Sequence, residues 1–325
     1  RQEIDGPQQN DPEHVGLASW GFPVVVPELN RIYCFYNKNV GKWDIREADT
    51  GVLRFRYSDD DGRTWSDETY DLDIERAAID HPNQDIEINW ITYQVPTITP
   101  GGDVIAGFTR WASEAYHSTE KNMLWRESEI WFHRFENILE EEDPNELVLS
   151  TWPKKEHGLR VPRPDNPEIS VAQEPSIQPL SDGRLLCIMR TLTGEVYYSV
   201  SEDDGYNWSQ PRVLWYEPDG EPMLNPITPC PLYKLKDGRF LLIFYNNDGT
   251  VNGGSGPADS RKNRTPVYFS VGEEMKGAGQ PVEFGFPKYL CGSDGVTIGP
   301  SERTEVATYP SFFEHEGESY LWYPD

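Results

Sequence analysis

Residues 58–65 read SDDDGRTW and residues 201–208 read SEDDGYNW, two copies of the pattern Ser-x-Asp-x-Gly-x-(polar)-Trp. Each copy directly follows a run of β-branched and aromatic residues, which is typical of a strand. In such a pattern the Ser and Asp side chains bind backbone amides of the turn, Gly adopts the left-handed conformation, and Trp packs back onto the sheet. The repeat therefore predicts strands that end in the same tight turn.

A second repeat surrounds the first and consists of a strand led by proline, a turn with Gly or Asn, and an apolar strand. It occurs five times, at residues 23–30, 96–102, 175–183, 231–238 and 310–317. In three copies a third strand follows, ending at Ser58, Ser201 and Ser270. Hairpins of constant length separated by loops of variable length are what the blades of a β-propeller need. We therefore predict an all-β chain that forms a single β-propeller domain over residues 1–325, with five blades visible and only two strands in the fifth.

The composition agrees with a β-protein and restricts its partners. The 325 residues include 11 Trp, 17 Tyr and 13 Phe, which favours strands over helices. Lys and Arg total 29 against 55 Asp and Glu, so the formal net charge is -26 and disfavours a nucleic acid or an anionic membrane as a partner. No apolar run approaches the roughly 18 residues of a membrane-spanning helix. No basic-then-apolar start is present, so we expect any signal segment to have been removed.

The cysteine pattern gives no indication of a metal site or a cofactor. None of the four cysteines lies in a CxxC pair or near histidines at metal-ligand spacing. Cys34 and Cys187 lie in strand-like runs, where we expect small buried residues rather than disulfides. A structural calcium ion among the acidic loops is left open, because such a site needs converging oxygens that a sequence does not display.

Both turn motifs and the order of the hairpins resemble the sialidase (neuraminidase) superfamily. The Asp-boxes of that superfamily match the two turns residue for residue, its members are six-bladed propellers, and the match spans most of the chain. Asp-boxes also occur in lyases and in noncatalytic proteins, so they indicate the fold and leave the chemistry to other positions.

The resemblance implies four site residues in the family's order. The glutamate that opens a first strand corresponds to Glu174, and the arginine that ends the next strand corresponds to Arg190. The arginine before the third strand of the next blade corresponds to Arg264, and the nucleophilic tyrosine to Tyr309. A tyrosine with an ordinary pKa near ~10 needs a neighbouring base, which Glu174 can supply. The two guanidinium groups would hold a sugar carboxylate at the channel mouth.

The resemblance also calls for an acid carboxylate in the loop after the first hairpin, where Asp44 and Asp49 are both candidates. The chain departs from the family at the first arginine, which is replaced by Gly21. Trp20 and Phe22, on either side of that position, would instead offer rings that stack on a sugar. The missing arginine argues against sialic acid itself and makes uronic-acid glycans or neutral sugars plausible substrates.

Three further side chains are candidates on weaker grounds. Arg110 ends its strand as Arg190 does, so it would either line the same mouth or form a surface salt bridge. His14 and His81 lie in loops beside first strands, and a loop histidine is available for proton transfer near neutral pH.

These expectations favour a secreted or periplasmic enzyme that cleaves a glycosidic bond at an acidic sugar with retention, using Tyr309 as nucleophile and Glu174 as its base. The expected partner is a glycan. One alternative on the same scaffold is a polysaccharide lyase, in which Tyr309 or a histidine abstracts the proton α to a uronate carboxylate. Another is a noncatalytic glycan-binding propeller. In a purely structural interpretation, Tyr309 is a core ring, while Glu174 and Arg190 form an ion pair that steadies one blade.

Overall fold

The computed structural model describes residues 4–6, 16–116, 123–218, 220–277, 279–300 and 302–323. The chain divides into two compact units: unit 1 comprises residues 1–159 and 203–207, and unit 2 comprises residues 160–202 and 208–325. The regular structure of the described residues consists of antiparallel strands and a few three-residue 3-10 helices, which confirms the all-β prediction. A single domain over residues 1–325 stays a prediction.

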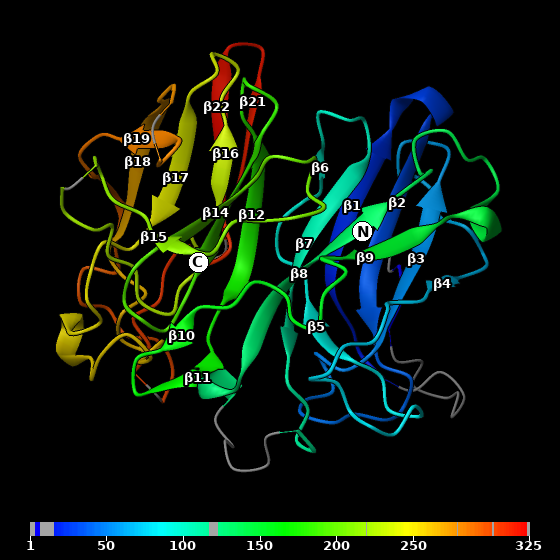
Figure 1. Cartoon of the computed structure of the whole chain (residues 1–325), viewed down its shortest axis with the longest axis horizontal. Helices are drawn as coiled ribbons and strands as arrows, with labels where there is room; N and C mark the ends of the chain where they lie inside the picture. The colour runs from blue at the N-terminus through cyan, green and yellow to red at the C-terminus, as the bar shows by residue number, and fades with distance from the viewer. Residues whose placement is uncertain are drawn as a thin grey trace. The chain divides into compact units, whose positions relative to one another are not determined.

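Unit 1 contains two antiparallel sheets (Figure 1). The first has the order β1-β2-β3-β4 and is made of β1 (Ala18–Val26), β2 (Arg31–Lys38), β3 (Val52–Ser58) and β4 (Tyr70–Leu72). The second has the order β5-β7-β8-β9, with β6 also paired to β7, and is made of β5 (Asn89–Ile91), β6 (Thr97–Ile98), β7 (Val104–Trp111), β8 (Ser128–Phe135) and β9 (Leu149–Trp152). The 3-10 helices are η1 (Pro27–Leu29), η2 (Met123–Trp125) and η3 (Pro144–Glu146).

Unit 2 contains two larger sheets and two hairpins. The sheet of β12 (Gln173–Pro179), β13 (Leu185–Arg190), β14 (Tyr197–Ser201) and β15 (Arg212–Val213) is in sequence order. The next sheet is made of β16 (Leu232–Lys234), β17 (Phe240–Phe244), β18 (Val267–Glu274), β19 (Val282–Phe284) and β20 (Lys288–Cys291), which pairs with β18. The hairpins are β10 (Pro162–Arg163) with β11 (Asn166–Ser170), and β21 (Ser311–His315) with β22 (Glu318–Trp322); η4 spans Val251–Gly253.

The five predicted hairpins are confirmed. Their turn residues share a positive φ, of 50° to 100°, and are Asn30, Gly102, Gly183, Gly238 and Gly317. Glycine adopts this region without a steric penalty, and asparagine tolerates it better than most residues. The fifth hairpin, β21 with β22, has only two strands, as predicted.

The third strands were predicted less well. β3 and β14 end at Ser58 and Ser201, as expected, whereas β18 continues past Ser270 to Glu274. β8, the third strand of the second sheet, lacks the turn motif and was not predicted.

In both repeated turns the aspartate accepts the predicted hydrogen bond from a backbone amide. In the first turn Asp60 Oδ1 accepts a bond from the backbone N–H of Thr64 at 2.8 Å. In the second turn Asp203 Oδ1 accepts the equivalent bond from Asn207, also at 2.8 Å. The tryptophan of the motif is buried in the second copy and half-buried in the first. The carboxylate thus replaces a backbone acceptor and closes the turn.

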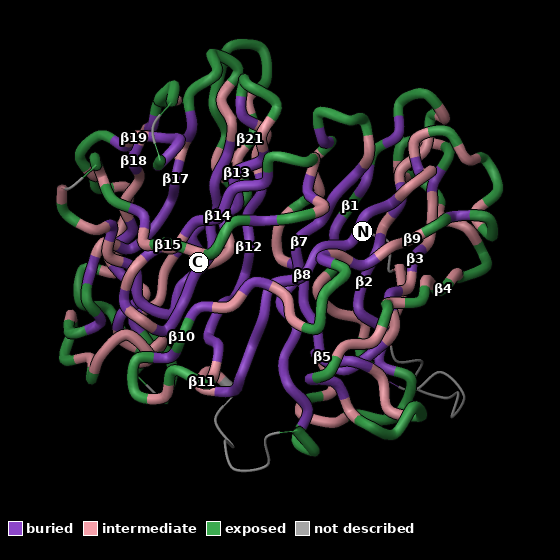
Figure 2. Tube along the Cα trace, viewed as in Figure 1, coloured by how far each residue is buried: buried purple, intermediate pink, exposed green. Residues whose placement is uncertain are grey.

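Aromatic rings fill the core of unit 1. Phe35, Phe55 and Phe108 are fully buried, and the rings of Phe35 and Phe135 lie 4.7 Å apart, which joins the first sheet to the second. Every residue of β7 and β8 is buried, and both strands are purple along most of their length in Figure 2. Burying one such ring contributes about 1.5–3 kcal/mol, so the sheets form a firm support for the loops at their ends.

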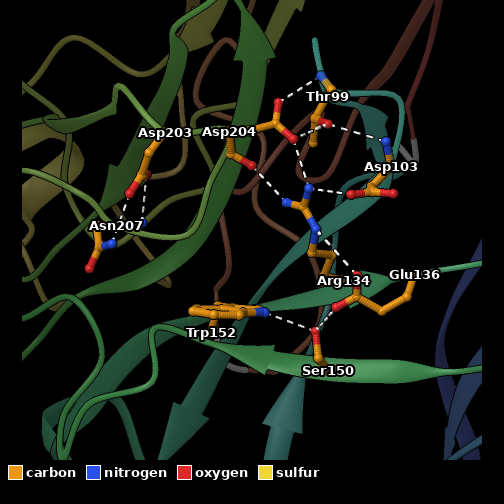
Figure 3. A network of polar contacts seen from close by, with 10 residues as sticks. Thr99, Asp103, Arg134, Glu136, Ser150, Trp152, Asp203, Asp204 and Asn207 are labelled. Carbon is orange, nitrogen blue, oxygen red and sulfur yellow. Dashed lines mark hydrogen bonds and ion pairs between the residues drawn. The ribbon is translucent and has the colours of Figure 1, made fainter.

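Residues 203–207 of the second turn belong to unit 1, where Arg134 of β8 binds them (Figure 3). Arg134 donates to the backbone carbonyl and to the carboxylate of Asp204, both at 2.7 Å, and also to the carboxylate of Asp103. The guanidinium carbon lies 4.1 Å from the ring centre of Tyr206. Burial acts to raise the pKa of Asp204, but hydrogen bonds from Arg134 and Thr99 hold it below its ordinary value. The turn is therefore fixed by a charged network.

The structure describes no helix that is both long and apolar enough to cross a membrane. All four cysteines are free thiols. Cys187 is fully buried, as predicted, while Cys34 is only partly buried.

Candidate functional site

Tyr309, Glu174 and Arg190 meet in unit 2. The Tyr309 hydroxyl donates to Glu174 Oε1 at 2.7 Å, and Arg190 Nη1 lies 2.8 Å from the same oxygen. Glu174 and Arg190 are buried, whereas Tyr309 is half-buried. The arrangement allows a phenolic proton to pass to a carboxylate that a guanidinium holds in place.

The register of β12 against β13 positions this pair. Gln173 lies opposite Arg190 and Pro175 lies opposite Met189, so Glu174 is the extra residue of a β-bulge. Gln173 Oε1 accepts hydrogen bonds from Arg190 Nη2 at 2.9 Å and from Arg190 Nε at 3.2 Å. Gln173 therefore orients the guanidinium of Arg190, which in turn binds the carboxylate of Glu174.

The backbone is strained at the two residues that meet. Glu174 has φ of 46° and Tyr309 has φ of 57°, in the left-handed region that bulky L-residues rarely adopt. Such a conformation costs on the order of 1–3 kcal/mol per residue and occurs most often at functional sites. Strain at both partners of one hydrogen bond supports a functional role for the pair.

Burial raises the pKa of Tyr309 to about 12, and the nearby negative charge of Glu174 acts in the same direction. The charges of Arg190 and Arg264 oppose this rise. The phenol is therefore protonated at neutral pH, and its oxygen becomes nucleophilic only when a base takes the proton. Glu174 is the carboxylate within hydrogen-bond distance of that proton.

Arg264, three residues before β18, completes the predicted group of four. Its Nη2 and Nε atoms donate to the carbonyl of Ile227 at 3.1 and 3.3 Å, and its Nη1 atom lies 3.4 Å from Glu305 Oε2. Its charge acts on the pKa of Tyr309, so all four side chains share one electrostatic cluster of unit 2. We name Glu174, Arg190, Arg264 and Tyr309 the tyrosine cluster. The roles of its members stay predictions.

The two candidate acids lie in unit 1 and differ in environment. Asp49 is fully buried, and burial raises its pKa although an ion pair with Arg46 opposes the rise. Trp20 Nε1 donates to Asp49 Oδ1 at 3.1 Å. Asp44 is half-buried and accepts a hydrogen bond from Asn89 Nδ2 at 2.8 Å. Asp49 has the raised pKa of a proton donor and Asp44 the better access, so both remain candidates.

Two predicted substrate-binding residues were wrong. Phe22 is 2% exposed and stacks on Phe35 with ring centres 5.5 Å apart, so it has no free face for a sugar. Arg110 is fully buried, its Nε atom lies 3.5 Å from Asp80 Oδ1, and its Nη2 atom donates to the carbonyl of Glu75 at 2.5 Å. Arg110 is thus part of an interior ion pair and neither lines a mouth nor lies in a surface salt bridge.

The histidine candidates gain no support as catalytic groups. His81 Nδ1 accepts a hydrogen bond from the backbone N–H of Asn83 at 3.0 Å, which shapes its own loop. His14 lies outside the described residues.

The structure adds two partners to the tyrosine cluster, Gln173 and Glu305. Gln173 meets Arg190 through the register of two strands, and Glu305 meets Arg264 through a loop. Neither position carries a sequence motif. The one available signal was that Glu305 lies four residues before Tyr309.

A histidine–carboxylate pair in unit 1 was also not predicted. His157 Nδ1 lies 2.7 Å from Glu129 Oε1, while Glu129 Oε2 accepts bonds from the Gly158 N–H at 2.9 Å and from Trp131 Nε1 at 3.1 Å. Glu129 is fully buried, so the pair fixes the loop after β9 from inside. Among the residues placed by the structure, no three His, Cys, Asp or Glu side chains converge as metal ligands.

Comparison with known proteins gives the family and the fold. The sequence profile of the BNR repeat-like domain family matches residues 8–277. The Hadza microbial sialidase Hz136 is 13% identical with a TM-score of 0.53; the match covers 89% of this chain and 49% of that one. The intramolecular trans-sialidase from Ruminococcus gnavus, solved with oseltamivir carboxylate, is 15% identical with a TM-score of 0.54, covering 99% and 77%. No curated protein sequence matches the chain.

Identities this low establish the fold and leave the activity open, and the chain spans only about half the length of the Hadza sialidase. The sheets of both units match the β-propeller predicted from the repeats. The chain belongs to the BNR repeat-like domain family and has the sialidase-type β-propeller fold.

Proposed function

We propose that this protein is a glycoside hydrolase that cleaves the bond next to an acidic sugar through a covalent tyrosine intermediate. The observation that carries the proposal is the 2.7 Å hydrogen bond from the Tyr309 hydroxyl to Glu174, made between two strained residues. A structural ion pair of Glu174 with Arg190 has no need of a strained, half-buried phenol on the same oxygen. The named relatives, a sialidase and a trans-sialidase, support the reaction class.

The chemistry follows from these contacts. Glu174 takes the phenolic proton as the Tyr309 oxygen attacks the anomeric carbon. A carboxylic acid protonates the leaving oxygen, a role for which the sequence offers Asp44 or Asp49. That aspartate then removes a proton from water as the water oxygen displaces Tyr309 at the same carbon. Glu174 returns the proton to the phenol. Two displacements at one carbon retain the anomeric configuration.

A carboxylate on the sugar would be recognised by Arg264, whose side chain is 13% exposed. Arg190 is less available, because Glu174 and Gln173 already bind all three of its nitrogens. One accessible guanidinium suits a sugar with a single carboxylate, such as a uronic or sialic acid. We also expect the protein to act outside the cytoplasm, secreted or in the periplasm, where such glycans are found.

The product identifies the reaction. Wild-type protein should release a free sugar from aryl glycosides of glucuronic or N-acetylneuraminic acid, and proton NMR at early times should show the anomer of the substrate. An inverted first product would exclude the tyrosine intermediate. An ultraviolet-absorbing unsaturated uronate would show a lyase instead, and binding without any product would show a noncatalytic glycan-binding protein.

The acid carboxylate should be revealed by the leaving group. Loss of the general acid slows departure of a poor leaving group, such as methanol, by about 10²- to 10⁴-fold, and barely affects an acidic nitrophenol. We expect this pattern for either Asp44→Asn or Asp49→Asn in measurements of kcat/KM. If a variant loses kcat/KM equally for methanol and for the nitrophenol as leaving groups, its aspartate is a positioning residue. If both variants behave in this way, neither aspartate is the general acid.

A further inference from the structure

We propose that Glu305 sets substrate specificity by competing with the carboxylate of the sugar for Arg264. The inference rests on the proposed function for the identity of the substrate, and on the contacts of Arg264 for its mechanism. The carboxylate of Glu305 lies on the side of Arg264 that the carboxylate of an acidic ligand would approach.

All three nitrogens of Arg264 already have partners within the protein. Its Nε and Nη2 atoms, which form one of the edges that grip a carboxylate bidentately, both donate to the carbonyl of Ile227. Its Nη1 atom lies 3.4 Å from Glu305 Oε2. A ligand carboxylate must therefore approach the edge that Glu305 already faces.

The loop that carries Glu305 is held beside Arg264. The backbone N–H groups of residues 304 and 306 donate to the carbonyls of residues 261 and 264, at 2.9 and 3.0 Å. Arg303 Nη1 binds the other oxygen, Glu305 Oε1, at 2.7 Å. Glu305 is thus fixed at both its backbone and its carboxylate, and it cannot leave Arg264 without losing contacts.

Repulsion between Glu305 and the carboxylate of the sugar would cause this competition. The side chains of Arg264 and Glu305 are 13% and 22% exposed, so a second carboxylate placed at Arg264 would lie close to a like charge in a partly dehydrated site. A neutral sugar would meet no such repulsion. Arg190 cannot take over the role, because it holds Glu174. Glu305 should therefore weaken the binding of acidic sugars and leave neutral sugars unaffected.

Calorimetry on the whole protein tests this with free glucuronic acid and N-acetylneuraminic acid as probes and glucose as the neutral reference. Glu305→Gln should lower the Kd of both acids about fivefold and leave glucose unchanged. Glu302→Gln removes the same charge from the same loop, where Glu302 lies 3.7 Å from Lys262, and should change nothing. Glu305→Asp keeps the charge but shortens the side chain, so its effect should be intermediate.

Three outcomes would overturn the proposal: unchanged acid binding in Glu305→Gln, an equal gain in Glu302→Gln, or no acid binding by either the wild type or the Glu305→Gln protein. The readout requires no turnover. A protein that hydrolyses nothing but gains acid binding in Glu305→Gln would refute the proposed hydrolase and keep the role of Glu305. Tyr309-dependent hydrolysis with unchanged acid binding in Glu305→Gln would support the proposed hydrolase and refute the role of Glu305.

Discussion

Replacing Tyr309 by Phe is expected to lower kcat/KM by at least about a thousandfold on every glycoside that the wild type hydrolyses. The substitution removes one oxygen atom, which is both the nucleophile and the donor to Glu174 at 2.7 Å. The ring remains, so its packing is preserved. Initial rates with an aryl glycoside measure the loss, and mass spectrometry of quenched reactions should find a glycosyl adduct on Tyr309 in the wild type only.

Tyr320→Phe is the matched control, because the Tyr320 hydroxyl also donates to a glutamate, Glu318, at 2.8 Å, but on exposed β22. It should keep full activity. If Tyr309→Phe hydrolyses aryl glycosides at the wild-type rate, Tyr309 is a core ring and the mechanism is wrong. If both variants lose activity together with thermal stability, the loss is one of folding and says nothing specific about Tyr309 as nucleophile; a Tyr309→Phe protein with the wild-type melting temperature removes this ambiguity.

The fold could be predicted because its information is local. A turn that needs a positive φ selects Gly or Asn at one position, and a carboxylate two residues after a serine closes the turn with its own oxygen. β8 escaped prediction for a physical reason. It is buried on both faces yet carries Glu129, His133 and Arg134, so neither an alternating pattern nor an apolar run marks it.

The burial of Phe22 could have been predicted from the sequence, whereas the environment of Trp20 could not. Side chains alternate along β1, and Phe22 shares a face with Val24 and Val26, which are buried. Trp20 would lie on that face too, but the register shifts between Ser19 and Phe22 and Trp20 has φ of 56°. A bulge of this kind redirects a side chain, and no motif in the sequence announces it.

The members of the tyrosine cluster could be predicted from the sequence, but their contacts could not. The order Glu174, Arg190, Arg264, Tyr309 named residues that do meet in unit 2. The expectation that both arginines await a sugar carboxylate needs revision, because Arg190 is bound by Glu174 and Gln173. Partners of this type depend on strand register and loop paths, which involve residues far apart in the sequence.

The largest expected loss of stability is that of Arg134→Met. The variant leaves the carboxylates of Asp103 and Asp204 beside each other without their shared cation, and removes the donor to the Asp204 carbonyl (Figure 3). Breaking a buried ion pair costs about 3–5 kcal/mol, and since these carboxylates are 28% and 21% exposed we expect about 2–3 kcal/mol. Urea denaturation at neutral pH measures the difference. Arg239→Met, in the exposed pair with Asp237, should leave the unfolding free energy close to that of the wild type.

Lowering the pH should reduce the difference in unfolding free energy between the wild type and Arg134→Met. The pKa of Asp204 is lowered in the folded protein, so its stabilisation is present above the unfolded pKa of about 3.9 and is lost as the pH falls through the folded value. The unfolding free energies of the two proteins should therefore converge below about pH 4. Adding Asp204→Asn to Arg134→Met removes the like-charge repulsion and should restore part of the stability at neutral pH. A constant difference across this pH range, with no rescue by Asp204→Asn, would mean that Arg134 stabilises the turn by packing on Tyr206 rather than by charge.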